Sequence, residues 1–537
     1  MRLLTTVAAL SCFLTQRRLE SKCLVPDDLV LDEMSSWDRT AIGLVPTMGG
    51  LHQGHLSLMQ RARQENSTVI VSIFVNPLQF SPNEDYSKYP RTLELDMQLC
   101  EQAGVDLIFA PTPEEMGVSQ KSIQESKVTQ VIPPSAMITG LCGGSRLGHF
   151  QGVATIVTKL FNLVQPDRAY FGQKDGQQLA IIRQLVADLN FPVEIVACPT
   201  LREASGLAFS SRNQYLSASE KQQAAVLYRG LQQAEAAFKA GVRNSEELIA
   251  AVRQEVAMVT NALVEYIELV EPNTLMSLVT VKEEGMLAIA ARLGSTRLID
   301  NILLSDRLPI IAIDGPAGAG KSTVARQVAA KLGLVYLDTG SMYRAVTWLV
   351  LQQGIAIDDE CAIAELANSC EIQLTPGQDL QSPVQVWING TNVTQVIRTV
   401  EVTSKVSAIA AQTAVRKALV KQQQSWGKRG GLVAEGRDIG THVFPDAEVK
   451  IFLTASVTER ARRRQEDFKK QNLPEVNLEQ LERDIAERDW KDSTRKVSPL
   501  QKAADAIEIQ TDGLSASEVT AKIVDYCQQR ISQLSSL

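Results

Sequence analysis

The sequence predicts an α/β protein built around two separate parallel sheets. In residues 41–200, short apolar runs alternate with helical stretches, and the same alternation starts again at Leu308. Strands that alternate with helices favour a parallel sheet covered on both faces. Two glycine-rich turns, at residues 48–55 and 315–322, each follow an apolar run and precede a helix. This is the setting in which backbone N–H groups bind phosphate.

The elements expected in the first half follow from its apolar runs. Leu3–Leu14 indicates a first strand that runs into a helix, although Arg2 and this run also suit a short export signal. The predicted strands are 41–45, 68–75, 105–110, 169–172 and 193–198, and the clearest helices are 56–64, 152–164 and 177–189. A smaller α+β portion follows, with strands at 266–270, 286–291 and 296–300.

The second half repeats the α/β pattern. Strands are expected at 310–314, 334–337, 432–434, 449–453 and 506–510, and a helix should run to Leu332 and end at Gly333. The short polar step at 304–307 separates two apolar strands and marks a boundary. The predicted domains are therefore residues 1–212, 213–304 and 305–537, with no internal repeat.

Composition limits the classes of partner. The chain has 537 residues, 45% of them hydrophobic and 21% charged, as in ordinary globular proteins. Its net charge of −7 argues against a nucleic-acid surface. No run after the N-terminus approaches a membrane span. Eight cysteines without a C-x-x-C pair fit a reducing cytoplasm. Small anionic molecules remain as substrates, and a cytoplasmic location is expected.

The first glycine-rich turn carries two of the four histidines. Val45-Pro-Thr-Met-Gly-Gly-Leu-His-Gln-Gly-His55 contains the pattern H-x-G-H. Glycines let the backbone approach phosphates closely, and imidazoles can donate hydrogen bonds to oxygens that gain charge at a reacting phosphorus. The pattern alone is a weak signal, since two surface or core histidines would produce it equally well.

The second turn is a stronger signal. Gly315-Pro-Ala-Gly-Ala-Gly-Lys-Ser322 matches G-x-x-x-x-G-K-[ST] between a predicted strand and helix. Its N–H groups would surround the phosphates, Lys321 would reach the outer ones, and Ser322 would hold Mg²⁺. The residues predicted to bind ATP here are Gly315, Pro316, Ala317, Gly318, Ala319, Gly320, Lys321 and Ser322.

Six further segments of the first half point to one enzyme family. They are 72–80 (SIFVNPLQF), 89–92 (YPRT), 148–153 (GHFQGV), 159–167 (KLFNLVQPD), 171–175 (FGQKD) and 210–213 (SSRN). Together with the H-x-G-H turn they closely resemble pantothenate synthetase (pantoate–β-alanine ligase) over nearly all of residues 1–303. The resemblance implies a Rossmann-like domain of the H-x-G-H nucleotidyltransferase type, completed by a small α+β domain, and a homodimer formed through this half.

The resemblance also implies a two-step reaction. The pantoate carboxylate attacks the α-phosphorus of ATP to give pantoyl adenylate and pyrophosphate, and β-alanine then displaces AMP to give pantothenate. His52 and His55 would lie along the phosphates, with His55 as proton donor, while Lys174, Ser210, Ser211 and Arg212 would stabilise pyrophosphate. Gln79 and Gln178 would bind pantoate. The implied ATP site consists of Met48, Gly49, Gly50, Leu51, His52, Gln53, Gly54, His55, Gly172, Gln173, Lys174, Asp175, Leu201, Phe209, Ser210, Ser211 and Arg212.

The second half has its own specific segments. They are 337–344 (LDTGSMYR), 436–441 (GRDIGT), 444–447 (FPDA) and 487–495 (ERDWKDSTR). With the P-loop they resemble bacterial cytidylate kinase across about 307–535, a P-loop nucleoside-monophosphate kinase that converts CMP or dCMP to CDP or dCDP with ATP. The CMP-binding residues implied are Thr339, Arg344, Ser407, Arg416, Arg437, Asp438 and Asp492. Arg488 would act in catalysis. Arg460, Arg462, Arg463, Arg464 and Arg495 would close over the phosphates, unless the four from 460 to 464 form a solvated helix face.

Three alternatives stay open or are disfavoured. A GTPase switch would need Asn-Lys-x-Asp, which residues 307–537 lack. Adenylate and shikimate kinases do not resemble both LDTGSMYR and GRDIG. One half could instead be a degenerate scaffold or regulatory module, against which the intact lysines and arginines of both halves argue. Residues 20–40 depart from the ligase pattern and are expected to form a surface insertion.

Overall fold

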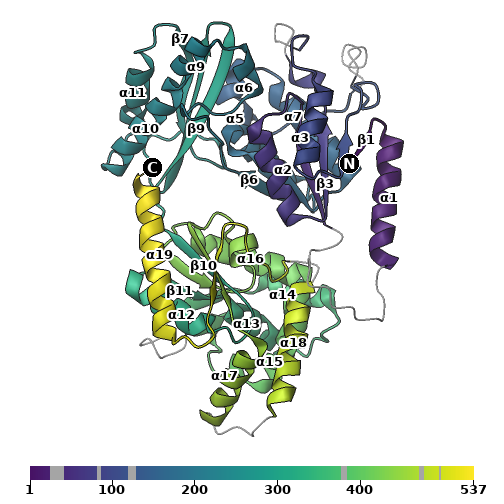
Figure 1. The fold of residues 1–537 in the computed structure, drawn as a ribbon, viewed down its shortest axis with the longest axis vertical. Coiled ribbons are helices and arrows are strands. Elements are labelled where there is room, and N and C mark those ends of the chain that lie inside the picture. Colours follow the sequence, from purple (N-terminus) through teal and green to yellow (C-terminus); the bar gives the residue numbers. More distant parts are fainter. Residues whose placement is uncertain are drawn as a thin grey trace. The chain divides into compact units, whose positions relative to one another are not determined.

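The computed structural model describes residues 1–23, 41–80, 86–118, 128–375, 384–470, 477–494 and 498–536. These residues form two compact units, Met1–Asp306 and Arg307–Leu537, each built on a parallel sheet (Figure 1). The predicted α/β fold class is confirmed. The finer division into three domains stays a prediction, and the insertion expected at 20–40 lies, beyond Cys23, outside the described residues.

The first unit contains a six-stranded parallel sheet in the order β1-β4-β3-β2-β5-β6. Its central strands are apolar on both faces, with Leu44, Val45, Ile70 and Val71 fully buried, as a sheet covered on both sides requires. The strands are β1 (Arg2–Leu4), β2 (Ile42–Thr47), β3 (Thr68–Ile73), β4 (Leu107–Phe109), β5 (Arg168–Gly172) and β6 (Glu194–Cys198). The covering helices include α1 (Val7–Cys23), α2 (Gln53–Glu65), α3 (Leu93–Gln102), α7 (His149–Val164) and α8 (Gly176–Asp188).

The N-terminal segment belongs to this sheet. β1 pairs in parallel with β4, and Leu10 and Leu14 of α1 are buried in the core beside α7. The interpretation of Leu3–Leu14 as a strand that runs into a helix is therefore confirmed. Among the described residues, no helix is both long and apolar enough to cross a membrane.

A smaller layer completes the first unit. Helices α10 (Val226–Lys239) and α11 (Ser245–Val256) pack on an antiparallel sheet of β7 (Ala262–Val270), β8 (Glu284–Leu293) and β9 (Thr296–Ser305). All three strands were expected, and each is longer than the apolar run that predicted it. α9 (Ala218–Ala224) begins with a capping box between Ser217 and Glu220, which satisfies N–H groups at the helix start.

The second unit contains a five-stranded parallel sheet in the order β11-β15-β10-β16-β17. These strands are β10 (Ile310–Asp314), β11 (Val335–Asp338), β15 (Leu432–Glu435), β16 (Val449–Thr454) and β17 (Ile507–Gln510). They match the five predicted runs closely. α12 (Lys321–Leu332), which ends before Gly333 as expected, packs with α19 (Ala516–Ser536) on one face of the sheet.

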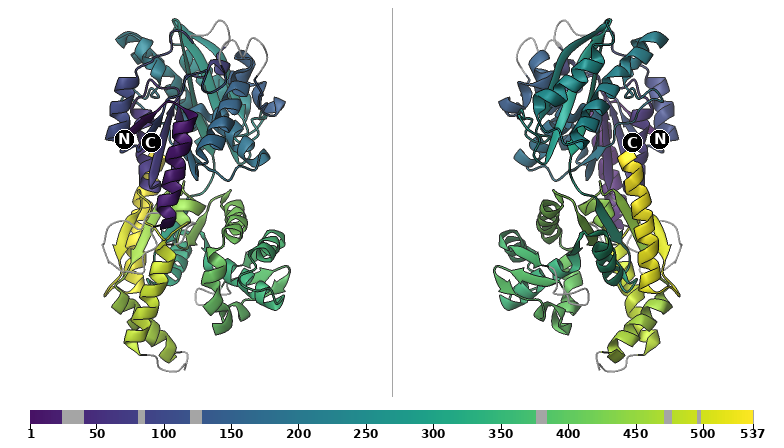
Figure 2. Two further views of the ribbon diagram at one scale, coloured as in Figure 1. Left: turned by 90° about the vertical axis from the view of Figure 1, so that its right-hand side faces the viewer. Right: turned by 90° about the vertical axis from the view of Figure 1, so that its left-hand side faces the viewer.

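Two further groups of helices extend from this sheet. α13 (Thr339–Gln352), α14 (Glu360–Ser369), α15 (Val400–Ala411) and α16 (Thr413–Gly427) form one group, and α17 (Val457–Lys470) and α18 (Leu478–Thr494) form the other. Figure 2 shows α17 and α18 (yellow-green) on one side of the second unit and the green segment containing α14 and α15 on the other. The first group also carries an antiparallel sheet of β12 (Ile372–Thr375), β13 (Gln385–Ile388) and β14 (Thr391–Asn392), which the sequence analysis did not predict.

Candidate active sites

The H-x-G-H turn lies at the carboxyl end of β2, in the middle of the first sheet. His52 caps α2, and its Nδ1 accepts a hydrogen bond from the Gly54 N–H at 3.1 Å. The centroids of the His52 and His55 rings lie 4.1 Å apart, and in the described part of the chain the buried His55 Nδ1 has no hydrogen-bond partner. An unpartnered buried nitrogen is costly unless a ligand satisfies it.

Both histidines are neutral at neutral pH. Burial, followed by the nearby His55 and Lys174, lowers the pKa of His52 to about 3. Burial and Lys174 lower the pKa of His55 to about 4. Neutral imidazoles still donate N–H hydrogen bonds to phosphate oxygens. If His55 is to act as the proton donor, the bound phosphates must first raise its pKa.

A buried aspartate fixes the backbone of this turn. Asp96 of α3 is 2% exposed, and its two oxygens accept hydrogen bonds from Gly50 N–H at 3.0 Å and Leu51 N–H at 2.8 Å. Burial raises the pKa of Asp96, while these hydrogen bonds act against the rise. Asp96 thus uses the two N–H groups of Gly50 and Leu51 itself, so those groups do not face the cavity.

Gln79 is positioned by a close contact between two elements. It ends the short turn Pro77–Gln79, which the Asn76 side chain holds by accepting from Leu78 N–H at 3.1 Å and donating to Gly152 O at 3.0 Å. A side chain at Gly152 would place its Cβ 2.3 Å from Leu78 O, so only glycine permits this approach of α7. Gln79 Oε1 is buried, and no described residue forms a hydrogen bond with it.

Lys174 is held from the smaller layer. It follows β5, and the Asn301 side chain on β9 donates hydrogen bonds to Gln173 O at 3.0 Å and Lys174 O at 2.7 Å. Lys174 Nζ lies 3.9 Å from Asp175. A second contact to β9 is a two-point ion pair between Arg202 and Asp300, at 2.6 and 3.0 Å.

Two neighbouring cavities of about 240 and 550 Å³ lie beside these elements. The predicted residues that line one or both are Met48, His52, Gly54, His55, Gln79, Gly172, Lys174, Asp175, Gln178, Leu201, Phe209, Ser210, Ser211 and Arg212. Gly49, Gly50, Leu51, Gln53 and Gln173 do not line either. Arg146 and His149 line both cavities and were given no role from the sequence, although His149 lies in the segment GHFQGV.

The P-loop of the second unit joins β10 to α12. Lys321 is 6% exposed, and its Nζ donates to Pro316 O at 2.7 Å. Burial and the neighbouring Arg437 hold the pKa of Lys321 well below its usual value. Of the predicted residues 315–322, Ala317 to Ser322 line a cavity of about 1070 Å³, while Gly315 and Pro316 do not.

The predicted CMP-binding residues all line this same cavity, from different elements: Thr339 and Arg344 on α13, Ser407 on α15, Arg416 on α16, Arg437 and Asp438 after β15, and Asp492 on α18. Several are already paired. Arg416 contacts the Asp438 carboxylate, Arg437 pairs with Asp492 at 3.0 Å, and Arg344 pairs with Asp338 at 3.1 Å. The cavity therefore presents oriented arginines.

Arg488 of α18 also lines the cavity, and its Nε is buried with no hydrogen-bond partner among the residues that the structure describes. Burial lowers the pKa of Arg488, and the nearby cations Arg437, Arg464 and Arg344 lower it further, against the pull of Asp492. Cations that depress one another's pKa create a strongly positive potential, which a polyphosphate would relieve.

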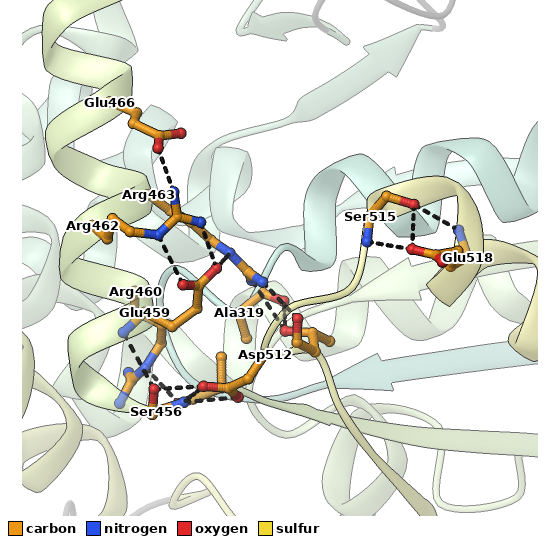
Figure 3. A network of polar contacts seen from close by, with 12 residues as sticks. Ala319, Ser456, Glu459, Arg460, Arg462, Arg463, Glu466, Asp512, Ser515 and Glu518 are labelled. Carbon is orange, nitrogen blue, oxygen red and sulfur yellow. Dashed lines mark hydrogen bonds and ion pairs between the residues drawn. The ribbon is translucent and has the colours of Figure 1, made fainter.

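The arginines that follow β16 divide into separate roles (Figure 3). Arg460 is 4% exposed, donates to Ala317 O of the P-loop at 3.2 Å and pairs with Asp489 at 2.6 Å. Arg463 reaches Thr511 Oγ1 at 3.0 Å, and Arg464 lines the cavity. Arg462 pairs with Glu459 and Glu466 and does not line the cavity, as expected of a solvated helix face. Arg495 lies outside the described residues.

Comparisons with known proteins match each half of the chain to a separate enzyme family. The family model for pantoate–β-alanine ligase matches residues 28–303, and that for cytidylate kinase matches residues 311–529. The chain thus combines an ATP-dependent ligase of the H-x-G-H class with a P-loop nucleoside-monophosphate kinase. It belongs to the family of bifunctional pantoate ligase/cytidylate kinases.

Two relatives illustrate this membership. The bifunctional pantoate ligase/cytidylate kinase of Trichormus variabilis is 81% identical over 99% of this chain and 100% of its own length. That of Acaryochloris marina is 58% identical over 91% of this chain and 92% of its own length. Among solved structures, the pantothenate synthetase of Thermus thermophilus is 43% identical, covers 56% of this chain and 99% of its own, and superposes with a TM-score of 0.49.

Proposed function

We propose that the chain catalyses two ATP-dependent reactions at separate sites. The first unit joins pantoate to β-alanine through pantoyl adenylate, with release of AMP and pyrophosphate, and the second phosphorylates CMP and dCMP. The observation that carries the proposal is that each unit has its own phosphate loop, at the carboxyl end of its own parallel sheet, beside its own cations.

In the ligase reaction, the site residues bring two anions together, the carboxylate of pantoate and the triphosphate of ATP. The neutral His52 and His55 donate N–H groups to the phosphates as the pantoate carboxylate attacks the α-phosphorus. Lys174 and Arg212 offset the charge that develops on pyrophosphate. The unpartnered Oε1 of Gln79 accepts a hydrogen bond from a pantoate hydroxyl, and Gln178, which lines both cavities, binds the same substrate.

In the kinase reaction, positioning and charge neutralisation do most of the work. Arg344, Arg416 and Arg437 hold the CMP phosphate, Asp438, Asp492 and Thr339 hold the sugar or base, and Ser407 reads the cytosine edge. Lys321 leaves Pro316 O to reach the ATP phosphates. Arg488, with its unpartnered Nε, stabilises the transferring phosphoryl group.

Mg²⁺ suits the donors beside the P-loop. Ser322 is the second residue of α12, and its side chain is in hydrogen-bonding contact with Glu435. Hydroxyl and carboxylate oxygens are the ligands that Mg²⁺ prefers, with nucleotide phosphates and water supplying the remainder. The described residues contain no cluster of three or more His, Cys, Asp or Glu side chains that could hold a metal, which fits an ion carried by the nucleotide. Mg²⁺ would supply charge neutralisation at the phosphates.

We further propose that the enzyme works in the cytoplasm on small molecules alone and that it forms homodimers through the ligase unit. The substrates are those of the two families, namely ATP, pantoate, β-alanine, CMP and dCMP. Light scattering on the purified chain measures the oligomeric state, and a monomer at micromolar concentration would contradict the dimer.

Substrate competition tests the kinase assignment. The purified chain should prefer CMP and dCMP to AMP and GMP by a factor of at least ~100 in kcat/KM, because a purine leaves buried polar groups of the site unpaired. Equal kcat/KM for CMP and AMP would contradict it. In parallel, formation of pantothenate should require ATP, pantoate and β-alanine together, and its absence would show that the first unit is a degenerate module.

A further inference from the structure

Asp314 is a buried carboxylate to which the proposed kinase reaction gives no role. It is the last residue of β10, directly before the P-loop, and it is 4% exposed. It does not line the 1070 Å³ cavity, so neither of its oxygens is placed to touch a nucleotide there. Any part it has in the reaction must therefore act through another residue.

Both oxygens of Asp314 are bonded to the loop that follows β15. Oδ1 accepts from Ile439 N–H at 2.8 Å, and Oδ2 accepts from Gly440 N–H at 2.7 Å. Ile439 and Gly440 open a single π-helical turn, Ile439–Val443. The first N–H groups of a helical turn have no partner inside it, and a carboxylate placed there makes strong, charge-assisted bonds.

That turn comes directly after Arg437 and Asp438, two residues of the proposed CMP site. β10 and β15 are neighbouring parallel strands, and Gly436 N–H donates to Ile313 O at 3.1 Å. The loop is therefore fixed to β10 on both sides of Arg437 and Asp438. The same carboxylate directly precedes the P-loop, so it links the backbone of the ATP-binding loop to that of the CMP-binding loop.

We propose that Asp314 is a positioning residue for phosphoryl transfer, which holds Arg437 and Asp438 in register with the P-loop. The inference rests on the proposed kinase function, because it assumes that CMP binds beside these two residues. Register matters here because the transferred group passes between two separately held substrates, and small misplacement of one against the other costs large factors in rate.

Asp314→Asn in the full chain is the direct test. The amide keeps the shape but has one acceptor oxygen, so one of the two N–H groups loses its partner. We expect the KM for CMP to rise and kcat to fall, each by ~10-fold, while the KM for ATP stays within about twofold because the P-loop backbone is intact. Failure of the wild-type chain to phosphorylate CMP would refute the proposed function itself, whereas an active wild type with a silent Asp314→Asn variant would refute this inference alone.

A matched control uses another carboxylate that accepts a backbone N–H. Asp359 caps α14 by accepting from Ala362 N–H at 3.0 Å and does not line the cavity. Asparagine caps helices equally well, so Asp359→Asn should leave both KM values and kcat unchanged. Pantothenate formation by the same preparations shows that the chain is intact outside the kinase unit.

Two results would overturn the proposal. One is an unchanged KM for CMP and unchanged kcat in folded Asp314→Asn. The other is a rise in the KM for ATP as large as that for CMP, which would indicate general damage to the P-loop. Circular dichroism checks folding.

Gly440→Ala covers the case in which Asp314→Asn does not fold. Its Cβ would lie 3.1 Å from Lys450 Cδ, which is a tight contact, and 3.4 Å from Asp314 Oδ2, which is an ordinary one, so it presses on this part of the loop mainly through Lys450. It should raise the KM for CMP several-fold and leave that for ATP unchanged, and wild-type kinetics in this variant would also overturn the proposal.

Discussion

The two units solve a similar problem with different groups. In each, a buried aspartate accepts two successive backbone N–H groups of a ligand loop: Asp96 holds Gly50 and Leu51, and Asp314 holds Ile439 and Gly440. The sites differ in charge. The smaller ligase cavity is lined by the neutral histidines with three cations, Arg146, Lys174 and Arg212, whereas the kinase cavity gathers Lys321 and a larger number of arginines.

The difference follows from the reactions proposed. A kinase must hold a triphosphate and a monophosphate together, so it needs many cations, and pairing them with carboxylates beforehand orients them. A ligase that releases pyrophosphate must also let it go, and neutral N–H donors bind it less tightly than fixed cations do. The contrast predicts that each cation removed from the ligase site has few neighbours to replace it.

The largest expected effect is therefore that of Lys174→Ala. Formation of pantoyl adenylate should slow by ~10²–10³-fold, as expected for loss of ~3–4 kcal/mol of transition-state stabilisation. CMP phosphorylation by the same preparation should be unchanged. Rapid-quench detection of the adenylate measures the step directly. A wild-type rate would show that other cations of the ligase site replace Lys174 and would contradict the prediction.

The neutral histidines predict that the first unit, and not the second, loses stability as the pH falls. The pKa values of His52 and His55 are lowered from 6.5 to about 3 and about 4, so the unfolded chain protonates first as pH falls below 6.5. At pH 5 this costs at most about 2 kcal/mol of stability for each histidine. Asp314 acts in the opposite direction, because burial raises its pKa from 3.8 to about 6 and part of the stability lost to this burial returns as pH falls from 7 to 5.

Hydrogen exchange followed by mass spectrometry resolves the two units. Between pH 7 and 5, after correction for intrinsic rates, peptides of β2 and α2 should lose protection, and peptides of β10 should not. The double variant His52→Gln, His55→Gln should remove the dependence in the first unit. If that variant keeps the full loss of protection, other groups are responsible.

The smallest expected effect tests whether Asp96 has the same importance for the first unit that Asp314 has for the second. Asp96→Asn should raise the KM for ATP in the ligase reaction by ~10-fold, about 1.4 kcal/mol, because one N–H of the turn loses its acceptor. The KM for CMP should not change. If Asp96→Asn is silent while Asp314→Asn is not, the two carboxylates are alike in geometry but not in importance.

Local patterns were enough to predict most of the elements that carry the two sites. β10 was predicted with its observed bounds, and α2 begins at Gln53, three residues before the expected start, because His52 is its cap. The small sheet β12–β14 was missed, since its strands are short and β14, Thr391–Asn392, carries no apolar signal. The roles of Asp96 and Asp314 were missed because their partners are 45 to 126 positions away.

The division of the arginines that follow β16 was also beyond the sequence. Arg460, Arg462 and Arg463 are near neighbours in one charged run, yet one contacts the P-loop, one faces outward and one reaches Thr511. Helical periodicity shows that they point in different directions. Periodicity does not show which of these directions faces the cavity, because that depends on the angle at which the chain turns from β16 into α17.

Asn301 makes the smaller layer of the first unit part of its chemistry. The Asn301 amide on β9 donates hydrogen bonds to Gln173 O and Lys174 O. The backbone position of Lys174 is therefore fixed by a strand more than a hundred residues downstream. In a chimaera that exchanged residues 213–304 between relatives, this lysine would keep its sequence context but take its placement from the donor. The position of Lys174 therefore depends on both layers of the first unit. Neither layer can be exchanged on its own without affecting this contact.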